Sequence, residues 1–200
     1  MTASSTLDHL VYATPNLDRS VRHLTQVTGV EAVEGGRHIG RGTRNFLLGF
    51  GDLRYLEIIG PDPERPEPAR PRPLGIDSLT GPRLVTWAVR TDDIDALVVQ
   101  ARAVGYDPGR IRPMARRTPD GDLLTWRATD RYDVVVPFVI DWGLTPHPAR
   151  DLPVVPLTAV HAHHPEPDEP RRRLAALGAG LDVHIGPSRL TAVIGDAVLA

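Results

Sequence analysis

The alternation of apolar and polar residues near the start of the chain predicts a strand over residues 7–13. His9, Val11 and Ala13 would share one side of this strand. An imidazole in the middle of an otherwise apolar strand is either a core residue or the first ligand of a site. The rest of the chain has to supply its partners.

A helix pattern follows the first strand. Asn16 can cap it, apolar residues recur at helical spacing, and Gly29 can end it. Three further strands are predicted over residues 30–34, 44–50 and 53–60. The order of elements is therefore βαβββ.

The same order returns after residue 82. Asp93 can cap a second helix and Gly105 can stop it. Strands are predicted over residues 84–90, 111–117, 123–128 and 134–140. The helix starts "ATPNLDRSV" and "VRTDDIDALV" align, which gives an internal repeat of about 77 residues and indicates a duplicated half-barrel.

The division of the chain follows from this repeat. We expect a first module over residues 1–60, a proline-rich connector over 61–82, and a second module over 83–148. "LTAVHAHHPEPDEPRRRLAALG" and two later apolar runs predict a partial third βαββ module, over 149–200, that packs on the same domain. The repeat thus favours a single α+β unit built from small modules.

Composition narrows the function classes. The 200 residues hold 23 basic and 25 acidic side chains, so no basic surface indicates nucleic acid, and a small neutral or mildly charged ligand fits better. There is no cysteine and no lysine, which excludes thiolate and lysine chemistry. We expect no signal peptide, no membrane contact and a cytoplasmic location. No dinucleotide fingerprint or G-x-S-x-G elbow is present, so no nucleotide cofactor is expected.

Several sequence blocks resemble the vicinal oxygen chelate superfamily, and within it the glyoxalase-like branch that includes glyoxalases, ring-cleaving dioxygenases and bleomycin-type resistance proteins. They are "LDHLVYATPNLDRSV", "GGRHIGRGTRNFLLGFGDLRYLEIIGPDP", "RTPDGDLLTW" and "PFVIDWGLTPHP". The resemblance extends from about Leu7 to Pro148. It implies paired βαβββ modules that form a cupped eight-stranded mixed sheet around a cavity. A homodimer is a further expectation.

The resemblance also implies a divalent metal (zinc, nickel, iron or manganese) held by His and Glu or Gln from the first and last strands of each module. Carried over, these positions fall on His9 and Glu57 in the first module. In the second they fall on Thr86 and on Phe138 or Ile140, which cannot ligate in the same way. The chain therefore keeps half of the metal site, and Thr86 and Phe138 become candidates for contacting a substrate.

A buried Glu57 carboxylate needs a partner, which could be a metal, an arginine or His9 itself. A metal would need a third protein ligand, and His38 in the glycine-flanked loop "GGRHIGRG" is the nearest candidate. A hydrogen-bonded pair of His9 and Glu57 without metal is the alternative.

The same glycine-rich region carries Arg37, Arg41 and Arg44, which could instead grip a carboxylate or phosphate of a ligand. Asn45 could hydrogen-bond a ligand from the cavity wall or satisfy neighbouring backbone. A solvated loop is the alternative for the whole region. Aromatic side chains of the second module could form a wall for a flat ligand, although aromatic residues mostly belong to cores.

A second histidine cluster lies in the third module. It contains His161, His163 and His164, with His184 on a predicted neighbouring strand. His161 and His163 share a strand face, a spacing that can bind zinc or nickel when a third ligand converges. Histidines at the edge of a covering flap are the alternative.

Two main functions follow. The first is an enzyme of the lyase, isomerase or dioxygenase type, in which a metal polarises two neighbouring oxygens of a small substrate and Glu57 carries a proton. The second is a non-catalytic protein that sequesters a small molecule, as in antibiotic resistance. A weaker third is a regulatory module that docks a partner through the proline-rich connector.

Overall fold

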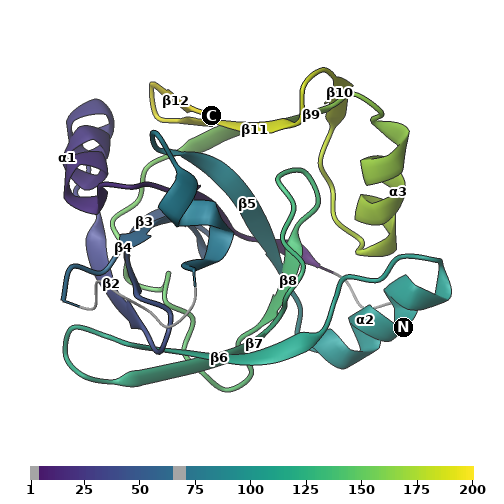
Figure 1. Cartoon of the computed structure of the whole chain (residues 1–200), viewed down its shortest axis with the longest axis horizontal. Helices are drawn as coiled ribbons and strands as arrows, with labels where there is room; N and C mark the ends of the chain where they lie inside the picture. The colour runs from purple at the N-terminus through teal and green to yellow at the C-terminus, as the bar shows by residue number, and fades with distance from the viewer. Residues whose placement is uncertain (1–4, 65–70) are drawn as a thin grey trace.

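The computed structural model describes residues 5–64 and 71–200 and consists of a closed barrel with a separate sheet on its outer side (Figure 1). The first module contains β1 (Thr6–Ala13), α1 (Leu17–Thr28), β2 (Val33–His38), β3 (Thr43–Gly51) and β4 (Arg54–Pro61). The second contains β5 (Arg83–Arg90), α2 (Ile94–Ala103), β6 (Ile111–Arg117), β7 (Leu123–Thr129) and β8 (Phe138–Asp141). The predicted α+β class is confirmed.

Both helices begin with the caps that the sequence predicts. The Asn16 side chain accepts from the backbone N–H of Arg19 at 3.1 Å, and the Asp93 side chain accepts from that of Ala96 at 2.9 Å. Gly29 ends α1 in the left-handed conformation, with φ 71°. Equivalent caps in equivalent places support the internal repeat.

The eight strands close in the order β1-β4-β3-β2-β6-β7-β8-β5. Two contacts join the modules: β1 pairs antiparallel with β5, and β2 pairs antiparallel with β6. Within each module the first and last strands pair in parallel. One side of every strand therefore faces the barrel interior, where a site can be assembled from both modules.

Two element predictions are wrong at their ends. The second strand does not end at residue 34 but runs to His38, so His38 lies in β2 and not on a flexible loop. The last strand of the second module does not begin at Val134. The Asp133 side chain accepts from the N–H groups of Val135 and Val136 in a tight turn, and β8 starts only after Pro137.

Part of the predicted connector packs against the barrel. Residues 65–70 of it lie outside the described residues, but Pro73–Ser78 forms a short 3-10 helix, η1. Ile76 of this helix is buried among the apolar side chains of the barrel interior. The connector is thus part of the wall around the interior.

The C-terminal segment contains β9 (Leu157–His164), α3 (Asp168–Ala176), β10 (Val183–Ile185), β11 (Arg189–Ile194) and β12 (Ala197–Leu199). Its sheet has the order β10-β9-β11-β12. The sequence predicts only two strands after the helix, and β12 is the third. In Figure 1 this sheet lies along the outer side of β5, where the Leu84 N–H donates to the carbonyl oxygen of Ala200 at 2.9 Å.

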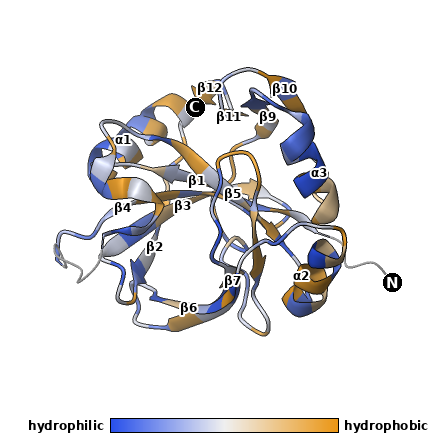
Figure 2. Ribbon diagram, turned by 45° about the vertical axis from the view of Figure 1, so that its right-hand side comes forward, coloured by the Kyte–Doolittle hydropathy of each residue, from blue (hydrophilic) through white to orange (hydrophobic). Residues whose placement is uncertain are grey.

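Apolar side chains form two cores, one on each side of the barrel wall. The outer core joins the wall to α1, α2 and the C-terminal sheet, and the inner core fills part of the barrel. Figure 2 shows hydrophobic residues along β1, β4 and β5, whereas α3 is largely hydrophilic. β1, β4 and β5 are therefore largely apolar on both faces, as expected for strands that are covered on both sides.

No helix in the described ranges 5–64 and 71–200 is both long and apolar enough to cross a membrane.

Candidate functional site

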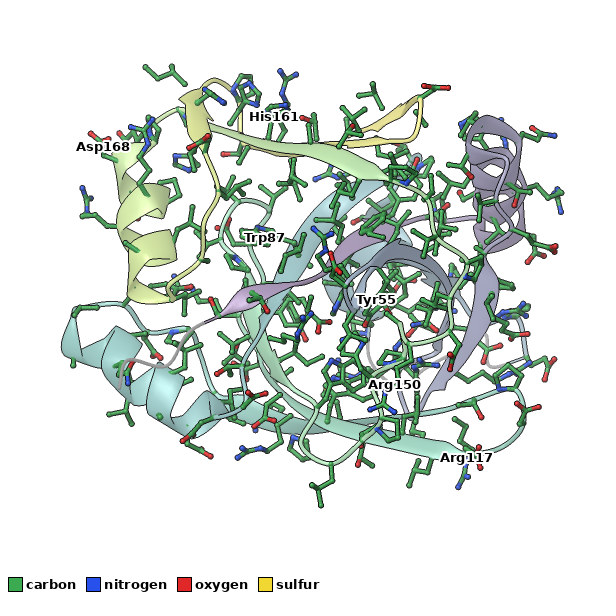
Figure 3. The ribbon with its side chains drawn as sticks, turned by 180° about the vertical axis from the view of Figure 1, so that it is seen from behind. Tyr55, Trp87, Arg117, Arg150, His161 and Asp168 are labelled. Atoms are coloured by element: carbon green, nitrogen blue, oxygen red, sulfur yellow. The ribbon has the colours of Figure 1, made fainter. Side chains whose placement is uncertain are left out.

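The barrel encloses a cavity whose free space, the open mouth included, is about 620 Å³. The first module contributes most of its polar lining, with His9, His38, Asn45 and Glu57. The second contributes a largely apolar wall that includes Trp126, Phe138, Ile140 and Trp142. Figure 3 places Tyr55, which also lines the cavity, among the side chains inside the barrel. A few polar groups in a largely apolar cavity are typical of small-molecule sites.

Glu57 lies at the centre of the polar lining and is 9% exposed. The Asn45 amide nitrogen donates to its Oε1 at 2.6 Å. His38 Nε2 is 3.5 Å from Oε1, and His9 Nε2 is 3.8 Å from Oε2. The predicted hydrogen-bonded pair of His9 and Glu57 is therefore not formed, and Asn45 holds the carboxylate instead.

Gly35 makes room for this arrangement. A Cβ atom at this position would lie 2.4 Å from Asn45 Oδ1 and 3.2 Å from Arg116 Nη1. A side chain at position 35 would thus displace Asn45, which is the residue that orients Glu57.

Asp8 orients His9 from behind. Asp8 Oδ1 is 2.6 Å from His9 Nδ1, so the ring presents Nε2 toward Glu57. The ring also stacks on Tyr55, with centroids 4.7 Å apart. In a regular strand Asp8 and His9 would face opposite sides, but β1 has a register shift between Leu7 and His9. Sequence alternation cannot show this bulge, so sequence reasoning missed Asp8.

The second oxygen of Asp8 receives two further contacts. His147 Nε2 lies 2.9 Å from Oδ2, and the Trp142 indole N–H donates to it at 3.1 Å. Burial alone would raise the Asp8 pKa, but the hydrogen bonds with His147 and His9 outweigh it and lower this pKa to about 2. Asp8 is therefore a fixed negative charge. His147 is buried in this network.

His38 lies on the opposite side of Glu57. Its Nδ1 is 3.1 Å from Thr43 Oγ1. Burial lowers the His38 pKa to about 4; Glu57 opposes the change, whereas Arg116 and Arg41 add to it. His38 is therefore a neutral hydrogen-bonding group at neutral pH.

The arginines predicted as ligand contacts separate. Arg41 lines the cavity, whereas Arg37 and Arg44 do not. Arg37 pairs with Asp62 and Glu64, and Arg44 stacks over the Phe46 ring at 5.4 Å. Strand alternation explains the result for Arg44, because its neighbours on β3 take the inner side. Arg116 from β6, which sequence reasoning did not single out, lines the cavity in their place.

The second module has apolar residues where the first has its polar ones. Val11 pairs with Glu57 in the first module and Ala88 pairs with Phe138 in the second, so Phe138 and not Ile140 corresponds to Glu57. Phe138 lines the cavity. Thr86 is fully buried, its hydroxyl has no hydrogen-bond partner in the described part of the chain, and it is not among the lining residues.

The donors expected for a metal do not converge. His9 and His38 face different oxygens of Glu57, and across residues 5–64 and 71–200 no group of three His, Asp or Glu side chains is arranged to hold a metal ion. The Arg116 guanidinium in the same cavity adds a positive charge close to the three donors. The predicted divalent metal at His9, Glu57 and His38 stays a prediction.

Comparison with known proteins identifies the family. A sequence profile described as "Glyoxalase-like domain" matches residues 7–178. The chain belongs to the glyoxalase-like domain family. A search of curated proteins finds no match for this glyoxalase-like protein.

Solved structures support the fold. A hypothetical protein from Staphylococcus aureus is 15% identical, with a TM-score of 0.63 over 86% of this chain and 74% of its own. Methylmalonyl-CoA epimerase from Mycobacterium tuberculosis is 22% identical, with a TM-score of 0.45 over 70% of this chain and 88% of its own. The first supports the fold alone, and the second likeness is too weak to support an argument about this chain.

The second histidine cluster of this glyoxalase-like protein lies away from the cavity, on the C-terminal sheet where Figure 3 labels His161. The His184 ring centroid is 5.6 Å from that of His163 and 6.1 Å from that of His161. Burial lowers the His163 pKa, and Arg189 adds to the effect. These rings do not form a metal-binding group as they stand in the described structure.

Proposed function

We propose that this glyoxalase-like protein is an enzyme that moves a proton at a carbon atom of a small molecule, with Glu57 as the proton acceptor. The observation that carries the proposal is the fixed carboxylate in the cavity. Glu57 is held by Asn45 through one oxygen, and its other oxygen faces His9. A positioned carboxylate in a largely apolar cavity is suited to general base catalysis.

The chemistry is an enolisation. Glu57 takes the proton from a carbon next to a carbonyl group, the C–H electron pair forms a C=C bond, and the carbonyl pair moves to oxygen. The positive charge of Arg41 stabilises the resulting enolate oxygen. If that carbon carries a hydroxyl group, Glu57 completes an isomerisation by returning the proton to the former carbonyl carbon, while the hydroxyl proton moves to the enolate oxygen and the hydroxyl-bearing carbon becomes the new carbonyl. Loss of a leaving group from the next carbon along, with its bonding electron pair, would instead make the reaction a lyase step.

His9 supports this step as a positioning residue. Because Asp8 holds its Nδ1, Nε2 is the ring atom available to contact Glu57 or the substrate. A divalent metal, if one binds here, would add Lewis acid polarisation of the carbonyl oxygen.

Hydrogen exchange in D2O tests the proposal. Pyruvate, 2-oxobutanoate and their methyl esters are incubated with the protein, and deuterium at C3 is followed by NMR. We expect the wild-type protein to exchange the C3 hydrogens faster than the protein-free solution does. The Glu57→Gln variant should lower this exchange rate by about 100-fold or more. The control variant His161→Gln, on the C-terminal sheet, should support exchange at the wild-type rate. The same series in the presence of a chelator shows whether metal contributes to the rate.

Exchange that is equally fast in Glu57→Gln would contradict the proposal. Tight binding of these compounds without exchange would instead support the non-catalytic binding function, which the apolar second module favours.

A further inference from the structure

Arg116 is the most buried arginine among the described residues and forms no ion pair with any of them, although Glu57 in the same cavity attracts its charge from farther away. It is 4% exposed and lines the cavity. In the part of the chain that the structure describes, no carboxylate lies within 4.0 Å of its guanidinium nitrogens and no side-chain hydrogen bond is formed by it. More exposed arginines such as Arg37 and Arg127 do have carboxylate partners.

Arg41 brings a second guanidinium to the same cavity. Its Nη2 donates to Met114 Sδ at 2.9 Å, and a thioether is only a weak acceptor without charge.

Glu57 is the one carboxylate among the described lining residues, and its Oε1 already accepts from Asn45. Asp8 lies outside the lining, and its oxygens are engaged by His9, His147 and Trp142.

The cavity therefore holds two guanidinium groups and one carboxylate. Burying a charge without a partner costs free energy. A ligand that carries a negative charge would offset this cost by pairing with the guanidinium groups. A guanidinium presents parallel N–H donors that match the two oxygens of a carboxylate. The apolar part of such a ligand would then pack against the second-module wall, which includes Trp126 and Phe138.

We propose that the substrate is a small carboxylic acid with a carbonyl group, and that Arg116, with Arg41 beside it, binds its carboxylate inside the barrel. This inference rests on the proposed function of Glu57. Arg116 then acts as a specificity residue: it places the acid so that the carbon next to the carbonyl faces Glu57.

Calorimetric titration tests the inference with pyruvate and 2-oxobutanoate, and with their methyl esters as uncharged counterparts. We expect the acids to bind the wild-type protein about 10- to 100-fold more tightly than the esters, and Arg116→Met to lose this difference. Arg116→Lys should restore part of it. Arg117→Met is the matched control, because Arg117 is the next residue on β6 and is exposed on the outer side (Figure 3).

Thermal unfolding separates this role from a structural one. Because Arg116→Met removes a buried charge that has no ion-pair partner among the described residues, the ligand-free variant should unfold at the same temperature as the wild type or at a higher one. A clear fall in the unfolding temperature would assign Arg116 to the fold and overturn the inference.

The two proposals fail separately. If the Arg116→Met variant still binds the acids more tightly than the esters, the carboxylate site is overturned. The proposed role of Glu57 as the proton acceptor is not affected by that result. Inorganic phosphate that binds through Arg116, while the acids do not, would also overturn it. If the inference holds, Glu57→Gln loses exchange but keeps its preference for the acids.

Discussion

Single residues set the electrostatics of the cavity. Glu57 carries the proposed chemistry, and Asp8 acts from behind the cavity wall through His9. His38 is kept neutral at neutral pH because burial lowers its pKa to about 4. Asp8 and His38 both have lowered pKa values, and the lowering makes Asp8 a fixed charge and His38 a neutral ring at neutral pH.

The stability of the protein should depend on pH through His38. The unfolded chain binds a proton at this ring as the pH falls through about 6.5, whereas the folded protein does so only near 4. His38 therefore destabilises the fold progressively between these two values, by about 3 kcal/mol in total. We expect His38→Gln to lose less stability than the wild type over this range in thermal unfolding at stepped pH.

His23→Gln, at an exposed position of α1, serves as the control. The Asp8 carboxylate contributes in a lower window, since its stabilisation is lost as the pH falls from 3.8 through about 2. Equal losses in His38→Gln and the wild type between pH 6.5 and 4 would show that His38 is not buried as described.

At the scale of elements, the barrel depends on the contact of β2 with β6. Only two register pairs join these strands, Arg37 with Arg117 and His38 with Arg116. The contact brings Arg116 of the second module beside the polar residues of the first. Gly36 allows this close approach, because its φ is 127° and a Cβ atom there would lie 1.8 Å from the carbonyl oxygen of Arg117.

Gly36→Ala should therefore open the barrel at this contact. We expect a loss of about 3 kcal/mol or more in the free energy of unfolding, measured by urea titration, together with weaker binding of small acids. Gly29→Ala is the control, because Gly29 has φ 71° but no atom of residues 5–64 or 71–200 lies within 4 Å of an added Cβ. It should lose only about 1 kcal/mol. Equal losses in the two variants would mean that the approach of β2 to β6 is not tight.

At the scale of the whole molecule, the C-terminal sheet and the barrel share one hydrophobic core. Leu190 and Ala192 of β11 belong to the same cluster as Trp87 and Val89 of β5. The sheet is thus continuous with the outer core of the barrel, and we expect the two to unfold together.

Leu190→Ala tests this coupling. The side chain is 1% exposed, so its truncation should lower the free energy of unfolding by about 2–5 kcal/mol. Tryptophan fluorescence reports on the barrel, since Trp87, Trp126 and Trp142 all lie within the second module or directly after β8. We expect fluorescence and circular dichroism to give the same transition. An early transition seen by circular dichroism alone would show that the sheet unfolds separately.

The sequence by itself determined the repeat, the helix caps and the inward positions of His9 and Glu57. These features depend on hydrogen bonds and side-chain periodicity within short segments, so local sequence is sufficient to predict them. The tertiary structure alone decided that Asp8 and His147 meet behind His9, and that Arg116 and not Arg37 or Arg44 reaches the cavity. A bulge in β1 and the register of β2 with β6 place these groups, and both depend on pairing between distant segments.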